Sequence, residues 1–190
     1  MNKIIWPLLL CAVLCGCGGG ETGNVVQEQY RTLETARLEA EVTSHTSTDS
    51  RTFTLLCSYD ADGDAVTTVT APGELAGLTA VVSGTDMTLS SEGLQLPAGA
   101  SLDICPANCL PYLLRALADG YVLEQSSEAL DDTPCLRLAL DTTAPGGSKV
   151  LCAVWLDAEG LFPRYAEFSR NEQVVLTVKL LAFTCTTSEG

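Results

Sequence analysis

Positive charge and histidine are scarce in this chain of 190 residues. Lysine and arginine together number 10 against 24 aspartates and glutamates, so the formal net charge is −14, and His45 is the only histidine. No cluster of basic residues relieves this charge, and a phosphate backbone would be repelled. We therefore expect no nucleic-acid partner.

Catalytic motifs are also absent. The sequence has no Gly-x-Ser-x-Gly, no histidine near a plausible nucleophile and no glycine-rich phosphate loop. Asp131 and Asp132 are neighbours in a Ser/Asp-rich stretch, where carboxylates are usually only solvated. The acidic stretch 60–64 does not complete an EF-hand loop, because Ala71 stands where the twelfth-position glutamate is needed. We predict a protein that is not an enzyme, with no cofactor and no metal.

Long hydrophobic runs are missing as well. The apolar segment 4–14 follows Lys3 and is interrupted by Pro7. It is too short to span a hydrocarbon core of ~30 Å, which needs about 20 residues. Its length is typical of the apolar region of a secretory signal peptide. We therefore predict that residues 1–16 are a signal peptide.

The segment ends in Leu14-Cys15-Gly16-Cys17, which resembles a bacterial lipobox. Only Cys17 follows a small residue that fits the peptidase. The resemblance implies a thioether-linked diacylglycerol on Cys17, cleavage before it, and acylation of the new N-terminus, as by palmitate. Two or three acyl chains, at roughly 0.8 kcal/mol per buried CH₂, anchor a protein stably. The alternative is an ordinary secretory signal with incidental cysteines.

The rest of the chain divides simply. Residues 17–23 comprise the lipidated cysteine and a flexible glycine-rich tether. Residues 24–190 have the length of a single domain with a real core. We expect this domain outside the cytoplasm, lipid-anchored to the cell membrane, or to the outer membrane if the envelope has one.

Six cysteines lie beyond the anchor: Cys57, Cys105, Cys109, Cys135, Cys152 and Cys185. An even number in an exported domain suggests disulfides, of which six cysteines allow 15 connectivities. Cys135 and Cys152 lie on strands expected to form a hairpin, so they are one candidate pair, and Cys105 with Cys109 is another. A redox or metal site at 105–109 is the alternative, although further ligands and zinc spacings are missing. Buried free thiols are a third interpretation.

Periodicity predicts a helix over 25–36 and a second over 106–117, whose leucines follow an i, i+3, i+4, i+7 stripe: Leu110, Leu113, Leu114 and Leu117. Alternating patterns and turn residues predict strands at 37–44, 52–59, 65–70, 78–83, 87–90, 121–125, 135–140, 149–157, 161–169 and 174–185. Short connections between them indicate a mostly up-and-down antiparallel meander.

The strand 149–157 is apolar on both faces. One face carries Val150, Cys152, Val154 and Leu156, and the other carries Leu151, Ala153 and Trp155. Such a strand is either covered on both sides or lines an apolar cavity. A packed core without a cavity explains the pattern equally well.

Three stretches resemble the LolA/LolB-like lipoprotein-carrier superfamily. They are "QYRTLETARLEAEVT", "ELAGLTAVVSGTDMTLSSEGLQL" and "VWLDAEGLFPRYAEFSRNEQVVLTVKLLAF", the last with an Asp-x-x-Gly-Leu-x-Pro turn. The resemblance implies a mainly β (α+β) fold: a bent, incomplete antiparallel β-barrel whose N-terminal and central helices cover the concave face. It also implies an apolar cavity between helices and sheet, which in carriers holds the acyl chains of a lipoprotein.

From this resemblance we expect a non-catalytic, membrane-anchored lipoprotein that binds a lipid, an acyl chain or another hydrophobic ligand. The leucine stripe and Trp155 are the expected cavity residues. One alternative is an envelope sensor or protein-interaction lipoprotein without bound lipid. The other is a redox or metal-binding protein, which requires reactive thiols at Cys105 and Cys109.

Overall fold

The computed structural model describes residues 21–100, 103–144 and 146–188. The predicted signal peptide and Cys17 lie outside the described residues. Within these ranges, no helix has both the length and the apolar character needed to cross a bilayer.

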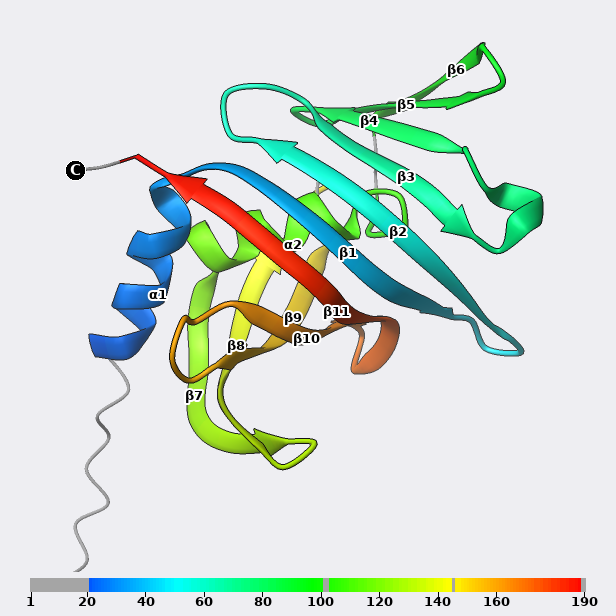
Figure 1. Cartoon of the computed structure of the whole chain (residues 1–190). Coiled ribbons are helices and arrows are strands. Elements are labelled where there is room, and N and C mark those ends of the chain that lie inside the picture. The colour runs from blue at the N-terminus through cyan, green and yellow to red at the C-terminus, as the bar shows by residue number, and fades with distance from the viewer. Residues whose placement is uncertain (1–20, 101–102, 145, 189–190) are drawn as a thin grey trace, which may run out of the picture.

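The described chain forms one antiparallel sheet with helices on one face (Figure 1). The helices are α1 (Glu21–Arg31), α2 (Cys109–Asp119) and the single-turn η1 (Gly73–Leu75). The strands are β1 (Leu33–His45), β2 (Ser50–Asp60), β3 (Ala65–Ala71), β4 (Thr79–Ser83), β5 (Asp86–Ser91), β6 (Leu94–Ala100), β7 (Tyr121–Leu130), β8 (Thr133–Thr143), β9 (Lys149–Asp157), β10 (Pro163–Arg170) and β11 (Gln173–Thr187).

The strand order is β6-β5-β4-β3-β2-β1-β11-β10-β9-β8-β7 in an 11-stranded sheet. Every pair consists of sequence neighbours except β1 with β11, which joins the two halves. The sheet bends around the helices without closing, so β6 and β7 form its two edges (Figure 1). The predicted fold class, an incomplete antiparallel barrel with two helices, is confirmed.

The central strand β1 shows how the sequence sets this arrangement. Its buried side chains alternate at Leu38, Ala40 and Val42, while the intervening side chains face away from the core. β1 pairs with β2 on one side and with β11 on the other. The helix predicted over 25–36 ends earlier, at Arg31, because Leu33 already pairs with Thr187 in the sheet.

The core lies between the sheet and both helices. Val26 and Tyr30 of α1, the apolar side of α2, and inward side chains such as Leu138 and Phe168 form one buried cluster. In Figure 1, α2 lies behind β11, β1 and β2, so the near face of the sheet is the one without a helix. We call this the outer face.

One strand was not predicted. β6 contains Pro97 and small residues, and its described side chains are exposed, including Leu94 and Leu96. Proline and glycine weaken the strand signal and are tolerated mainly at sheet edges, where β6 lies.

Candidate functional site: a hollow where two strands separate

The outer face opens where β10 and β11 separate. Their ladder ends at the pair Tyr165–Lys179, but β11 continues to Thr187 with β1 as its strand partner. Arg164 is skipped in the β9–β10 register, and Leu181 is skipped in the β1–β11 register. These two residues are β-bulges, which bend their strands and locally disrupt pairing.

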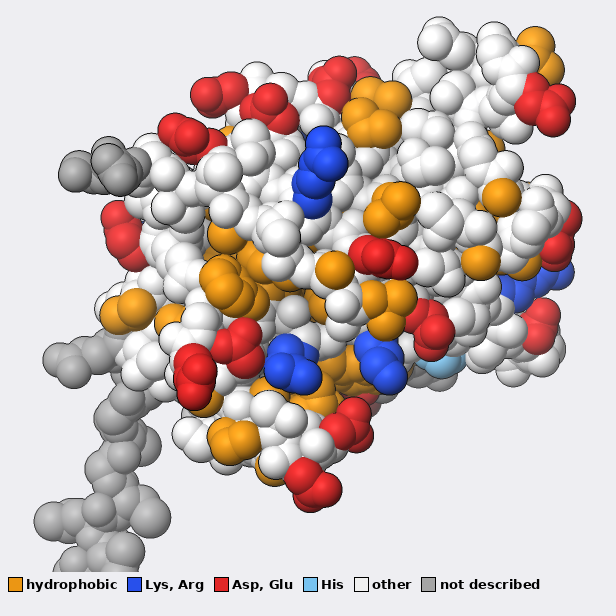
Figure 2. Space-filling model, in the orientation of Figure 1, with side chains coloured by type: hydrophobic (Ala, Val, Ile, Leu, Met, Phe, Trp, Pro, Cys, Tyr) orange, Lys and Arg blue, Asp and Glu red, His pale blue; other side chains and the backbone are white. Residues whose placement is uncertain are grey.

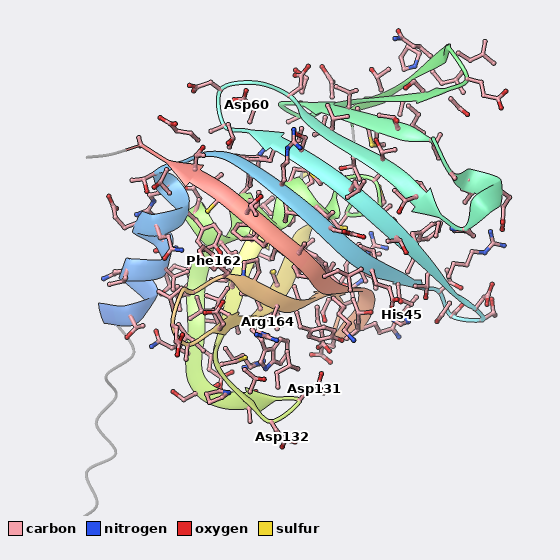
Figure 3. All side chains as sticks on the ribbon, viewed as in Figure 1. His45, Asp60, Asp131, Asp132, Phe162 and Arg164 are labelled. Carbon is pink, nitrogen blue, oxygen red and sulfur yellow. The ribbon has the colours of Figure 1, made fainter. Side chains whose placement is uncertain are left out.

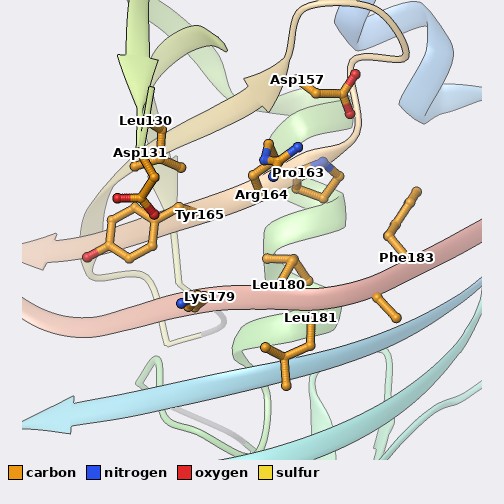
Figure 4. A pocket seen from close by; sticks show the side chains of 11 residues that line it. Leu130, Asp131, Asp157, Pro163, Arg164, Tyr165, Lys179, Leu180, Leu181 and Phe183 are labelled. Carbon is orange, nitrogen blue, oxygen red and sulfur yellow. The ribbon is translucent and has the colours of Figure 1, made fainter. Parts of the chain in front are cut away.

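A hollow of about 440 Å³ lies at these bulges. Its apolar lining consists of Leu130, Pro163, Leu180, Leu181, Ala182 and Phe183, and its polar lining of Asp131, Asp157, Arg164, Tyr165 and Lys179. Figure 4 shows these side chains on the outer side of β10 and β11, with α2 behind the strands. The volume falls within the usual range of small-molecule sites.

Apolar side chains are accessible at the hollow and beside it. Leu181 is 51% exposed, and Phe162, at the end of the loop before β10, is 38% exposed. The rings of Phe162 and Phe183 lie 5.3 Å apart between centroids. Figure 2 shows hydrophobic side chains gathered in the depression between β10 and β11, with basic side chains beside it. Contiguous exposed apolar surface of this kind commonly marks a binding site.

The loop between β9 and β10 closes one end of the hollow and is firmly held. Asp157 accepts hydrogen bonds from the backbone N–H of Glu159, Gly160 and Phe162, at 3.2, 2.6 and 3.2 Å. From α1, the Tyr30 hydroxyl donates to the carbonyl oxygen of Leu161 at 3.0 Å. Burial raises the pKa of Tyr30 well above its ordinary value, so this hydroxyl stays a donor. The rim of the hollow is therefore preorganised.

The charges around the hollow differ in their partners. The Asp157 carboxylate is already used by the loop amides. Asp131 lies in the β7–β8 turn with Asp132, both at positive φ and exposed, on the side of β10 that carries Arg164 (Figure 3). Among the described residues, neither Arg164 nor Lys179 has a carboxylate within ion-pair distance.

Trp155 lies beside this site on the outer face. Its indole N–H donates to Glu128 at 3.0 Å, and the Arg137 guanidinium stacks 5.3 Å from its ring. Its ring lies 5.4 Å from that of Tyr165, a lining residue of the hollow. Hydrogen bonds from Ser126 and Trp155, with Arg137 nearby, hold the pKa of Glu128 below its ordinary value. Trp155 does not face the leucines of α2, because its neighbours Val154 and Leu156 take the core face.

The four predicted leucines do come together, but inside the core. Leu110, Leu113 and Leu117 are 0% exposed and Leu114 is 2% exposed. They pack in the cluster shared by α1, α2 and the sheet. The structure thus separates the predicted cavity residues into a closed leucine core and an outward tryptophan.

The cysteine predictions need correction. All six described cysteines are free thiols. Cys135 lies opposite Asp157 and Cys152 opposite Leu140, five positions away along the hairpin. At ~3.3 Å per residue this is roughly 17 Å, far beyond the reach of a disulfide. The predicted Cys135–Cys152 bridge is therefore wrong.

The segment 105–109 forms the turn that leads into α2, where the Cys109 N–H donates to the carbonyl oxygen of Cys105 at 3.0 Å. The local bridge is not formed. Cys109 is fully buried, and burial raises the pKa of both thiols. A reactive cysteine needs the opposite, an exposed thiol of lowered pKa. The described residues also contain no metal-binding cluster of His, Cys, Asp and Glu.

One signal of the hollow is present in the sequence. In the run Lys179-Leu180-Leu181-Ala182-Phe183 the alternation of strand residues fails, which is typical of a bulge. The chemistry that the lining offers is apolar contact and charge, which suits binding of a ligand.

No protein-family model and no curated protein sequence matches the chain. Solved structures do resemble it. A DUF1329 family protein from Desulfovibrio piger has 12% identity and a TM-score of 0.54, over 89% of this chain and 92% of that one. A domain described as outer membrane lipoprotein-sorting, from Vibrio parahaemolyticus, has 11% identity and a TM-score of 0.50, over 88% and 93%. An uncharacterized conserved protein from Thermus thermophilus has 9% identity and a TM-score of 0.51, over 90% of each chain.

At such identities the likeness establishes the fold. The chain has the fold of the lipoprotein-sorting domain, and the resemblance to LolA/LolB-like carriers inferred from the sequence is confirmed at that level.

Proposed function

We propose that the protein is a bacterial envelope lipoprotein, anchored through acylated Cys17, that binds a lipid, an acyl chain or another hydrophobic ligand without catalysis. The ligand occupies the hollow between β10 and β11. The observation that carries this proposal is the hollow itself, with its apolar walls at Leu180, Leu181 and Phe183. The fold shared with a lipoprotein-sorting domain supports it.

The packing of α2 favours the hollow over the space behind the helix. A ligand between α2 and the sheet has to displace four buried leucines. At roughly 1.5–3 kcal/mol per leucine this costs about 6–12 kcal/mol before the ligand's own contacts contribute. That is comparable to the whole stability of a typical domain, about 5–15 kcal/mol. Binding at the hollow needs no such opening.

The proposed anchor keeps the domain close to lipid. Glu21, the first residue of α1, follows Cys17 by four positions. Four residues span at most about 14 Å, so an acylated Cys17 holds the domain at the membrane surface. The cell membrane fits this geometry, as does an outer membrane if the envelope has one.

Two matched serine variants test the site. The lipoprotein is purified from membranes and placed in phosphatidylcholine nanodiscs, with Cys17 acylation checked by mass spectrometry. Trp155 is the only tryptophan beyond the predicted signal peptide and contacts Tyr165, so energy transfer to a fluorescent fatty acid reports occupancy. Leu181→Ser removes half-exposed apolar surface from the hollow, and Leu123→Ser removes similar surface, 55% exposed, from β7.

We expect Leu181→Ser to weaken probe binding about fivefold, since losing half of a leucine contact amounts to about 1 kcal/mol. Leu123→Ser leaves it unchanged. Equal effects of the two variants, or energy transfer no greater than that to an empty nanodisc, would refute the proposal.

A further inference from the structure

The hollow contains two features that a purely hydrocarbon ligand leaves unused. The first is a pair of cations. Five basic residues of the described chain have acidic partners within 4 Å: Arg31, Arg51, Arg137, Lys149 and Arg170. Four have none among the described residues: Arg37, Arg115, Arg164 and Lys179. Of these four, only Arg164 and Lys179 line the hollow.

The strand register places the two basic residues near each other. Lys179 lies opposite Tyr165 in the β10–β11 ladder, and Arg164 is the bulged residue directly before Tyr165. Two adjacent positions in the sheet therefore present positive charge at the same rim of the hollow (Figure 4).

Acidic groups also face this rim and must be counted. Asp131 and Asp157 line the hollow, Glu41 lies opposite Lys179 in β1, and Glu167 accepts a hydrogen bond from the Tyr165 hydroxyl at 3.1 Å. Asp157 is already bonded to three backbone amides. The rim thus keeps two cations whose charge no carboxylate neutralises at contact distance.

The second feature is the open edge of β11. Backbone groups of a strand point alternately to its two sides. From Ala182 to Thr187 one side of β11 is paired with β1, whereas the β10 ladder has already ended at Lys179. On the side away from β1, the backbone of this segment has no strand partner, and an unpaired N–H next to apolar walls favours an acceptor. A carboxylate or phosphate is the strongest such acceptor.

Together these features define a candidate anion-binding site beside apolar side chains. We propose that the ligand is an anionic amphiphile from the membrane, whose carboxylate or phosphate head is held by Arg164, Lys179 and the free N–H groups of β11. Its chain lies on Leu181 and the neighbouring apolar lining. This inference rests on the proposed function and adds the charge of the ligand to it.

The test compares head groups at constant chain length. In the nanodisc assay, dodecanoate, dodecyl phosphate, 1-dodecanol and inorganic phosphate each compete with the fluorescent fatty acid. Arg164→Gln and Lys179→Gln remove the proposed contacts. Arg51→Gln and Lys149→Gln change the net charge equally, at exposed ion pairs with Asp49 and Asp141 outside the lining of the hollow. Unchanged thermal unfolding verifies the fold of each variant, and Arg164→Lys tests whether charge alone restores binding.

We expect Arg164→Gln and Lys179→Gln each to lower the affinity for dodecanoate and for dodecyl phosphate by about tenfold, which is the usual effect of losing a charge-assisted hydrogen bond. The affinity for 1-dodecanol stays unchanged, the two control variants change affinities less than about twofold, and Arg164→Lys recovers part of the loss. Inorganic phosphate alone competes only weakly.

Other outcomes separate the two proposals. If 1-dodecanol binds the native protein as tightly as dodecanoate, the anionic head is refuted while the hydrophobic site stands. If inorganic phosphate competes as well as dodecyl phosphate, the site is for a free anion and the amphiphile is refuted. If no dodecyl compound binds and an acidic extended peptide does, both proposals fail.

Discussion

The closed packing of α2 can be tested by removing one side chain. Leu113 is 0% exposed and belongs to the cluster that joins α2 to the sheet and to α1. Leucine-to-alanine changes at such positions cost roughly 2.7–5.0 kcal/mol, because the transfer free energy of the removed atoms and the cavity left behind both count. For Leu113→Ala we expect a loss of about 3 kcal/mol in the free energy of unfolding.

The assay is urea unfolding followed by circular dichroism. With an m-value of about 2 kcal/mol/M, a loss of 3 kcal/mol lowers the urea midpoint by about 1.5 M at unchanged slope. Leu181→Ala is the control, because its side chain is 51% exposed and its loss leaves no closed cavity. We expect it to change the midpoint by less than about 0.4 M.

The same variant distinguishes a packed core from a ligand cavity. If the leucine stripe lined an empty cavity, Leu113→Ala would only enlarge existing free space. A loss below about 1 kcal/mol, combined with a changed affinity for the fluorescent fatty acid, would refute the closed core and restore the cavity behind α2.

Three further outcomes follow from single contacts. Gly120→Ala lowers the thermal midpoint by several degrees, because the new Cβ meets the Ala116 carbonyl oxygen at 2.5 Å, whereas Gly73→Ala, with open space around it, leaves the midpoint unchanged. Asp157→Ala lowers the free energy of unfolding by about 1–3 kcal/mol and speeds hydrogen exchange of the three loop amides that donate to Asp157 in the native protein. Unchanged exchange would contradict this role. Burial raises the pKa of Cys57 from 9.0 to about 11, so between these values the unfolded chain has lost a proton that the native chain keeps. Stability therefore falls as the pH rises through this window, by up to about 2.7 kcal/mol from this thiol, and urea unfolding of Cys57→Ala shows a shallower fall.

The sequence predicted most of the sheet because alternation is a local signal. The strand expected over 149–157 has those bounds in the structure, and its core face carries Val154 and Leu156. The helix–strand junction was harder. Tyr30 and Leu33 fit a helical spacing, but Leu33 pairs with Thr187, a residue far along the chain. Pairing with a strand far along the chain sets this boundary, so the local sequence pattern does not show it.

Trp155 shows why a face of a strand is harder to assign than the strand itself. An apolar residue on the second face suggested a cover by a helix. The structure covers it with neighbouring strand side chains, namely the Arg137 guanidinium, the Tyr165 ring and the Glu128 carboxylate. Long charged side chains can shield apolar surface in this way, so charge on adjacent strands does not exclude a partly buried aromatic between them.

The candidate site depends on registers and was therefore the least predictable part. The hollow exists because β11 extends beyond the end of its ladder with β10, and because the β-bulges at Arg164 and Leu181 lie beside each other. Each bulge is a mismatch of one residue between strands, and their adjacency depends on a third strand, β1. The helices on the concave face position the core, whereas these two irregularities place cations and leucines together on the opposite face. If a ligand binds here, the fold serves to hold an opening in the sheet rather than to enclose a cavity behind it.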